Sequence, residues 1–126
     1  MRLLLDTHVL HWFFYEPRRV RDKVAATLRD PDNDLYASAV STWEIAIKAA
    51  LGKIKAEPKD LAREIAATGM RELPITIAHT MAVRDLPSHH KDPFDRILIA
   101  QALNDGLTIV SADRIFAAYS VPVLSA

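Results

Sequence analysis

The sequence contains no cysteine among its 126 residues, which excludes disulfide bonds and metal sites with thiolate ligands. Any bound metal must therefore be held by oxygen or by imidazole nitrogen. The sequence also lacks a run of about 18 apolar residues and a basic, then apolar leader with a small-residue cleavage site. We therefore expect neither a membrane span nor a signal peptide, and we expect the protein to be cytoplasmic.

The chain has no excess of charge of either sign, because 16 Lys and Arg residues balance 16 Asp and Glu residues. A role in binding nucleic acid would therefore need a local basic patch. Only three glycines occur, and none forms the phosphate-binding loop of a nucleotide-binding domain. Half of the residues are apolar, so we predict one domain, residues 1–126, with its own core.

The most clearly delimited element is a helix expected between Asp92 and Gly106. Asp92 can act as its N-cap, Pro93 fits the first helical position, and Gly106 can end the helix in the left-handed conformation. Residues 97–103 are apolar at all positions but one, so the rest of the fold must cover most sides of this helix. Asp95 would then lie in the first turn of a buried helix, where a carboxylate needs a partner or a cation.

Short apolar runs alternate with helical patterns along the chain. Strands are expected at residues 3–5, 35–40, 73–75, 107–110 and 121–124, and helices at 7–14, 17–28, 41–51, 58–68, 76–86 and 93–105. This alternation is typical of an α/β sandwich around a mostly parallel sheet. In such sheets, ligands bind at the carboxyl ends of the strands.

Acidic residues follow several of these strands. Asp6, Glu44 and Asp113 come after strand ends, and a short loop would bring Asp95 to the same edge of the sheet. Carboxylates gathered in one crevice repel one another unless a cation joins them or one takes up a proton. Mg²⁺, or Mn²⁺ as an alternative, suits ligation by oxygen with open water positions. Such a metal supports hydrolysis of phosphodiester bonds.

Each acid also has a structural explanation. Glu44 would be the partner of Ser41 in a capping box. Asp95 would gain from the dipole of its helix, and Asp113 could cap the short helix that follows it. Asp6, which directly follows a buried strand, is the hardest to explain in this way.

Several other kinds of site and protein compete with this interpretation. His8 and His11 share a helix face and His89 and His90 are adjacent, but no further ligands for a zinc ion are evident. A haloacid-dehalogenase-type phosphatase would need an Asp at the position of His8, and a receiver domain would need an acidic pair after its first strand. A non-catalytic binding module on the same fold remains the main alternative.

Four segments carry a recognisable set of motifs. They are LLLDTH at residues 3–8, STWEIAIK at 41–48, LP at 86–87 with HHKDPFDR at 89–96, and TIVSAD at 108–113. In this order, and across essentially the whole chain, they closely resemble PIN-domain ribonucleases of the VapC toxin type. The resemblance implies a three-layer α/β/α sandwich and a Mg²⁺-dependent endoribonuclease that cleaves RNA with a metal-activated water. It also implies the toxin of a toxin–antitoxin pair, a homodimer, and inhibition by a VapB-like antitoxin.

The resemblance also implies which residues form the site. The first three acids of the family match Asp6, Glu44 and Asp95, and the fourth and most variable acid matches Asp113. Asp92 matches none of the four, and we interpret it as a cap. We therefore predict that these four acids are catalytic and surround the metal, with Asp6 and Asp95 as the nearest ligands.

A basic rim is expected beside these acids, where it would hold the phosphates of RNA. The side chains predicted for it are Arg18, Arg19, Lys48, Lys91, Arg96 and Arg114. An arginine or lysine from the extended tail of the antitoxin could compete with the metal for Asp6 or Asp95.

Overall fold

A five-stranded sheet lies at the centre of the computed structural model, which describes all residues from 1 to 126. All pairings between neighbouring strands are parallel, and the order across the sheet is β3-β2-β1-β4-β5. The strands are β1 (Arg2–Leu5), β2 (Asp34–Ser38), β3 (Arg71–Leu73), β4 (Thr108–Ser111) and β5 (Val123–Ser125). The prediction of an α/β sandwich is confirmed, with a sheet that is wholly rather than mostly parallel.

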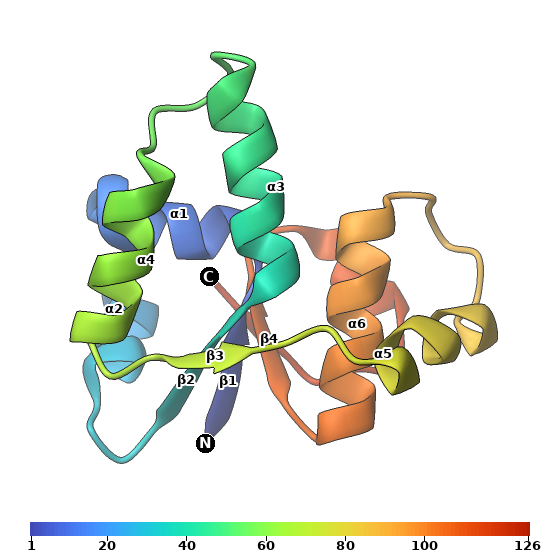
Figure 1. The fold of residues 1–126 in the computed structure, drawn as a ribbon. Helices are drawn as coiled ribbons and strands as arrows, with labels where there is room; N and C mark the ends of the chain where they lie inside the picture. The colour runs from blue at the N-terminus through green and yellow to red at the C-terminus, as the bar shows by residue number, and fades with distance from the viewer.

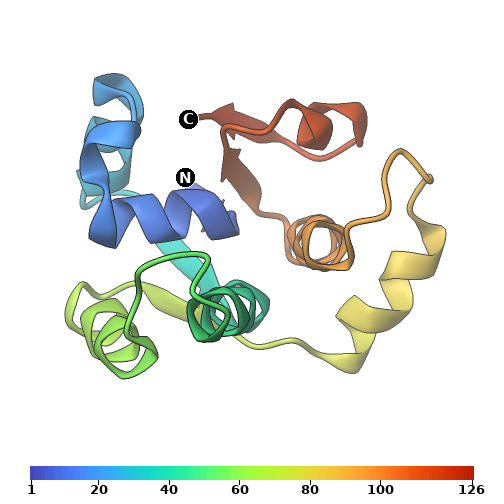
Figure 2. The same cartoon turned by 90° about the horizontal axis from the view of Figure 1, so that it is seen from above.

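Helices lie on both sides of this sheet (Figures 1 and 2). The α-helices are α1 (Thr7–Tyr15), α2 (Asp22–Arg29), α3 (Ala39–Ala50), α4 (Pro58–Ala67), α5 (Ile77–Ala82) and α6 (Pro93–Asp105). Short 3₁₀ helices follow three of the elements: η1 (Pro17–Arg19), η2 (Val83–Asp85) and η3 (Arg114–Ala118). Helix α3 rises beyond the sheet, between α4 and α6, as Figure 1 shows. No helix is both long and apolar enough to cross a membrane.

The central strand β1 is buried on both of its faces. Leu3 and Leu5 belong to one hydrophobic cluster, together with residues of α1, α2 and α4. Leu4 belongs to a second cluster, formed with residues of α6 and η3. This double burial explains why the strand is an uninterrupted apolar run without polar alternation.

Helix α6 begins and ends where its sequence predicts. The side chain of Asp92 accepts a hydrogen bond of 3.0 Å from the backbone N–H of Asp95. Gly106 ends the helix with φ 68° and ψ 43°, the left-handed conformation that glycine adopts most readily. Residues 98–102 are buried, whereas Leu103 is 45% exposed, so the helix is covered on most sides but not all.

The predicted start of α3 is wrong. Strand β2 ends at Ser38 rather than at residue 40, and the Ser38 hydroxyl caps the helix by accepting from the N–H of Val40 at 3.1 Å. Ser41 is therefore inside the helix, where it accepts a hydrogen bond of 3.2 Å from Thr7 Oγ1. The capping box of Ser41 and Glu44 does not exist, which removes the structural explanation proposed for Glu44.

Candidate active site

The four predicted acids lie at the carboxyl edge of the sheet. Asp6 follows β1 and caps α1, whereas Asp113 follows β4 and caps η3. Glu44 is on α3, which directly follows β2, and Asp95 is in the first turn of α6. Because β2, β1 and β4 are neighbours in the sheet, three of these segments leave it side by side.

Asp6 is almost completely buried, with 2% of its surface exposed. Its Oδ1 accepts a hydrogen bond of 2.8 Å from the N–H of Val9, and its Oδ2 accepts one from the Ser111 hydroxyl. Burial raises the pKa of Asp6 above its usual value, and the charge of Asp113 adds to this, while the hydrogen bonds and His8 act in the opposite direction. Asp6 is thus both a structural cap and a carboxylate that would gain from a nearby cation.

Glu44 has one paired and one unpaired carboxylate oxygen. Lys48, one turn further along α3, places its Nζ 2.8 Å from Oε2. Oε1 is the only fully buried side-chain nitrogen or oxygen atom in the structure without a hydrogen-bond partner. Buried polar atoms are almost always satisfied, so this oxygen is available to accept from a water molecule or to bind a cation.

Asp95 resembles Glu44 in having one unpaired oxygen. Its Oδ2 lies 3.2 Å from Nε2 of His90, and its Oδ1 makes no hydrogen bond within the chain. The pKa of Asp95 is raised to about 6, because burial and the negative charges of Asp92 and Glu44 together outweigh the lowering effect of His90. The influence of Glu44 shows that the two carboxyl groups lie in the same electrostatic environment.

Asp113 is exposed and has the structural role that its position predicts. Its carboxylate accepts a hydrogen bond of 3.0 Å from the N–H of Ile115, at the start of η3. Its own N–H donates to the Ser111 hydroxyl, also at 3.0 Å, and that hydroxyl in turn donates to Asp6. Ser111 therefore connects the first and the fourth acid.

The chemistry of these side chains fits an oxygen-bound divalent cation. Glu44 and Asp95 each have a free carboxylate oxygen, and burial, with a smaller contribution from neighbouring acids, raises the pKa of both Asp6 and Asp95. Hard cations such as Mg²⁺ and Mn²⁺ prefer ligands of this type. As the side chains are placed, however, no three His, Asp or Glu residues lie close enough together to hold an ion. The carboxylates therefore have the chemistry of ligands for a hard cation, but their placement does not form a coordination site.

Three members of the predicted basic rim already have partners within the protein. Lys48 pairs with Glu44, as described above, and Arg96 donates to the carbonyl oxygens of Val83, Leu86 and Pro87. Arg19 lies over the ring of Trp12 and pairs with Glu16. The remaining members, which make no ion pair, are Arg18, Lys91 and Arg114.

Sequence reasoning missed three side chains that contact the acids or their partners. These are Ser111, His90 and Tyr119, whose hydroxyl lies 2.7 Å from Nδ1 of His90. His90 is part of the motif HHKDPFDR, but nothing in the sequence indicates that its ring faces Asp95. Tyr119 lies in a segment without any recognised motif.

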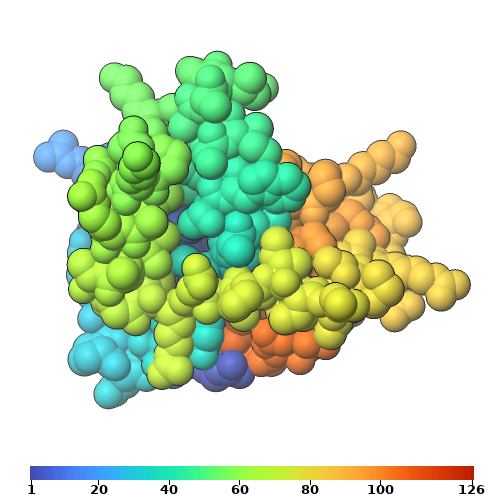
Figure 3. Space-filling model, viewed as in Figure 1, coloured from blue at the N-terminus to red at the C-terminus, as the bar shows by residue number.

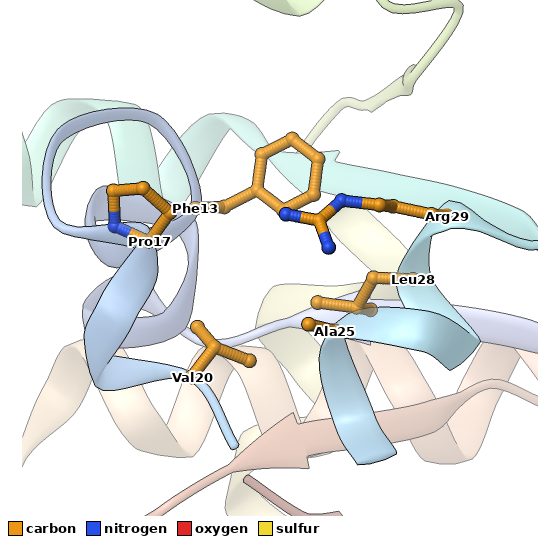
Figure 4. Close-up of a pocket in the computed structure, with 6 residues that line it drawn as sticks. All are labelled: Phe13, Pro17, Val20, Ala25, Leu28 and Arg29. Carbon is orange, nitrogen blue, oxygen red and sulfur yellow. The ribbon is translucent and has the colours of Figure 1, made fainter. Parts of the chain in front are cut away.

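A pocket of about 290 Å³ lies away from the acids, between α1, η1 and α2. Figure 4 shows its lining residues, which are Phe13, Pro17, Val20, Ala25, Leu28 and Arg29. This lining contains no acid and no histidine. The pocket therefore offers no groups for acid–base or metal chemistry.

Comparison with known proteins identifies the family of this chain. The PIN domain family matches residues 3–122. Ribonuclease VapC22 of Mycobacterium tuberculosis is 32% identical over 114 residues, which cover 89% of this chain and 87% of that protein.

Solved structures share the fold at lower identity. VapBC2 from Rickettsia felis, bound to a DNA fragment, has a chain that superposes with a TM-score of 0.76 at 13% identity, covering 100% of this chain and 99% of that one. A toxin–antitoxin complex from Klebsiella pneumoniae has a TM-score of 0.63 at 19% identity, covering 98% and 96% of the two chains. With almost its whole length matched, the chain belongs to the PIN-domain family and is a homologue of ribonuclease VapC22.

Proposed function

We propose that the protein is a Mg²⁺-dependent endoribonuclease and the toxin of a toxin–antitoxin pair. The observation that carries this proposal is the unpaired, buried Oε1 of Glu44 in the same electrostatic environment as Asp95, whose pKa is raised to about 6. Together with Asp6 and Asp113, these residues are the acids that the PIN-type motifs imply. The homology to a named ribonuclease supports RNA as the substrate.

The acidic side chains would bind and orient the components of the reaction. Asp6 and Asp95 would be the nearest ligands of the cation, and Glu44 and Asp113 would act through water. A bound Mg²⁺ would supply an activated water and positive charge at the phosphate. Ser111 holds the Asp6 carboxylate in place, and Lys48 holds Oε2 of Glu44 so that Oε1 stays free.

Lys91 and Arg114 are the basic side chains best placed to hold the RNA backbone. Both side chains are exposed. In the sequence, Lys91 precedes Asp92, the N-cap of α6, and Arg114 follows Asp113. Contacts from a few such side chains to phosphates make binding strongly dependent on salt. We therefore expect RNA affinity to fall steeply with rising salt concentration.

A protein partner would control the activity. Related folds have been solved in complexes described as toxin–antitoxin pairs. We propose a VapB-like antitoxin whose extended tail places an arginine or lysine beside Asp6 or Asp95. A charged donor of this kind would form strong hydrogen bonds with carboxylates in a partly dry site and would compete with the cation.

Two helices also offer a surface for a second copy of the chain. Trp43 on α3 and Leu51 at its C-cap are 57% and 64% exposed, and Ile77 and Met81 on α5 are 81% and 66% exposed. Figure 3 shows both helices on the same face of the molecule. An apolar surface of this kind favours a homodimer. Replacing Ile77 and Met81 together by lysine should convert a dimer into a monomer in analytical ultracentrifugation.

The nuclease proposal is tested with purified protein, single-stranded RNA, and Mg²⁺ or EDTA. Wild-type protein should cleave RNA with Mg²⁺ and leave 5′-phosphate and 3′-hydroxyl ends, because water rather than the ribose 2′-hydroxyl attacks. Asp6→Asn and Asp95→Asn should abolish cleavage while keeping the fold. Asp60→Asn, an exposed acid on α4 with an Arg63 contact, is the matched control and should cleave normally.

Cleavage that persists in EDTA, or 2′,3′-cyclic phosphate ends, would contradict the proposed mechanism. The toxin role has a separate test in cells. Expression of the wild-type chain should arrest growth, Asp6→Asn should not, and co-expressed antitoxin should restore growth. Equal growth with the two forms, in the absence of an antitoxin, would argue against a toxin and leave a nuclease with another duty or a binding module.

A further inference from the structure

His90 is joined to Asp95 on one side and to Tyr119 on the other. Its Nε2 lies 3.2 Å from Oδ2 of Asp95, and its Nδ1 lies 2.7 Å from the Tyr119 hydroxyl. The same hydroxyl accepts a hydrogen bond of 3.1 Å from Nη1 of Arg96. These four side chains form a continuous chain of hydrogen bonds that ends at a carboxylate of the candidate site.

Arg96 sets the direction of this chain because a guanidinium only donates hydrogen bonds. Tyr119 is 4% exposed, and Nδ1 of His90 is the only acceptor for its hydroxyl hydrogen. The hydroxyl therefore donates to Nδ1, and the imidazole hydrogen on Nε2 donates to Asp95. A hydrogen on Nδ1 would instead leave the buried hydroxyl without an acceptor, which is unfavourable.

The Arg96 end of this series of hydrogen bonds is held firmly in place. Besides Tyr119, the Arg96 guanidinium binds the carbonyl oxygens of Pro87 at 2.8 Å, Val83 at 3.3 Å and Leu86 at 3.4 Å. Because these carbonyls belong to η2 and the segment after it, the guanidinium has little freedom to turn. The orientation of the His90 ring is therefore determined by residues outside the acidic site.

We propose that His90 is a positioning residue for Asp95. The hydrogen bond from Nε2 holds the carboxylate by Oδ2, so that Oδ1 stays free for a divalent cation. Without this bond, the negative charges of Asp92 and Glu44, both of which act on Asp95, would favour its turning away. This inference rests on the proposed metal-dependent function and extends it to a residue outside the four acids.

The test compares three variants with a neighbouring control. His90→Ala removes the donor, and His90→Gln restores an amide N–H near the position of Nε2. Tyr119→Phe keeps the buried ring but removes the hydroxyl that selects the tautomer. His89→Ala is the control, because the His89 ring packs against Tyr119 at 4.9 Å without contacting a carboxylate.

The first readout is the ¹⁵N spectrum of the His90 imidazole in metal-free protein. We expect the hydrogen on Nε2 in the wild type, and a mixture with the Nδ1–H form in Tyr119→Phe. A purely structural role for Tyr119 would not change this tautomer. The Nδ1–H form in the wild type would overturn the inference.

The second readout is the affinity for Mn²⁺, measured on the purified protein without RNA. We expect His90→Ala to weaken binding by roughly 10- to 100-fold, as is typical for residues that orient metal ligands. His90→Gln should recover most of this loss, and His89→Ala should bind as the wild type does. Unchanged affinity in His90→Ala would overturn the positioning role.

RNA cleavage separates this inference from the proposed function. If both are right, His90→Ala should lower kcat while leaving KM for RNA nearly unchanged. A wild type that cleaves no RNA but shows the expected tautomer and Mn²⁺ affinities would overturn the nuclease and support the positioning role. A wild type that binds no Mn²⁺ would overturn both.

Discussion

Ser111 donates the hydrogen of its hydroxyl to Oδ2 of Asp6, across the pairing of β4 with β1. The hydroxyl also accepts a hydrogen bond from the N–H of Asp113. One small side chain thus satisfies a buried carboxylate and positions the loop that carries another acid. Its removal should affect stability, the pKa of Asp6 and the candidate site together.

We expect Ser111→Ala to lower the free energy of unfolding by about 1–3 kcal/mol, because it leaves a buried carboxylate oxygen without its donor. The same change should raise the pKa of Asp6 further, since the Ser111 hydrogen bond lowers it. Denaturant titration and NMR titration of the carboxyl carbon measure the two effects.

Ser125→Ala is the matched control, because Ser125 pairs with Ser111 on the adjacent strand and its exposed hydroxyl makes no hydrogen bond. Its effect should stay within about 0.5 kcal/mol. Equal losses in the two variants would show that the hydroxyl of Ser111 has no special role.

The raised pKa of Asp95 predicts how stability depends on pH in the metal-free protein. The folded chain holds this proton up to about pH 6, whereas the unfolded chain releases it near 3.8. The free energy of unfolding should therefore fall as the pH rises from 3.8 to about 6. After allowance for solvent screening, this loss should be on the order of 1–2 kcal/mol.

Asp95→Asn should remove this particular dependence. As the pH rises from 4 to 7, the free energy of unfolding of the variant should increase relative to that of the wild type. Denaturation in EDTA at several pH values measures this difference. A difference between the two proteins that does not vary with pH would contradict the raised pKa of Asp95.

Asp105 should show the opposite dependence. Burial raises its pKa, but Asn104, His79 and Arg2 outweigh burial and lower it below the usual value. The two carboxylate oxygens both lie 3.2 Å from Nε2 of buried His79, whose Nδ1 accepts from the N–H of Thr76. Stability from Asp105 should be present above its unfolded pKa and lost as the pH falls through the lower, folded value.

We expect Asp105→Asn to lose about 1 kcal/mol at pH 7, and to approach the stability of the wild type in strong acid. Denaturation curves at both pH values measure this difference. Asp32→Asn, in an exposed turn and without a side-chain hydrogen bond, should be neutral at both. A loss in Asp105→Asn that is as large in acid as at pH 7 would show that charge is not the cause.

Lys48 should contribute most to the stability of the protein when no metal is present. Lys48→Met leaves both oxygens of buried Glu44 without a partner, so we expect a loss of about 1–3 kcal/mol in EDTA. Because a cation near Oε1 would replace the missing charge, Mg²⁺ should reduce the loss. Lys53→Met, which removes an exposed lysine without an ion pair, is the control; a Mg²⁺-independent loss in Lys48→Met would argue against a cation at Glu44.

Features that depend on neighbouring residues could be predicted from the sequence. The apolar run of β1 and the cap, proline and glycine of α6 act locally, and the structure confirms each of them. Neighbouring residues do not determine the start of α3, because serine, a good N-cap, occurs at both 38 and 41. Ser38 lies opposite Leu73 of β3, and its hydroxyl donates to Gln101 at 2.6 Å. These distant contacts extend β2 only as far as Ser38, and no local pattern contains them.

In the candidate site, too, local features could be predicted from the sequence and long-range contacts could not. All four acids could be singled out because they follow strands or open helices, and because their motifs are recognisable. The partners of these acids could not, since Tyr119 is 29 positions from His90 and Ser111 is 105 positions from Asp6. Side-chain contacts of this range depend on the packing of the sheet and helices, which residue spacing does not encode.

The position of β1 between β2 and β4 has a consequence for protein synthesis. Leu3 pairs with Thr108, so the middle of the sheet remains open until the segment that forms β4 has left the ribosome. A nascent chain that already contains Asp6 and Glu44 lacks the strand and the serine that close the site around Asp6. Completion of the acidic cluster therefore comes late in translation, so the proposed nuclease would stay incomplete while most of its own messenger RNA is being translated.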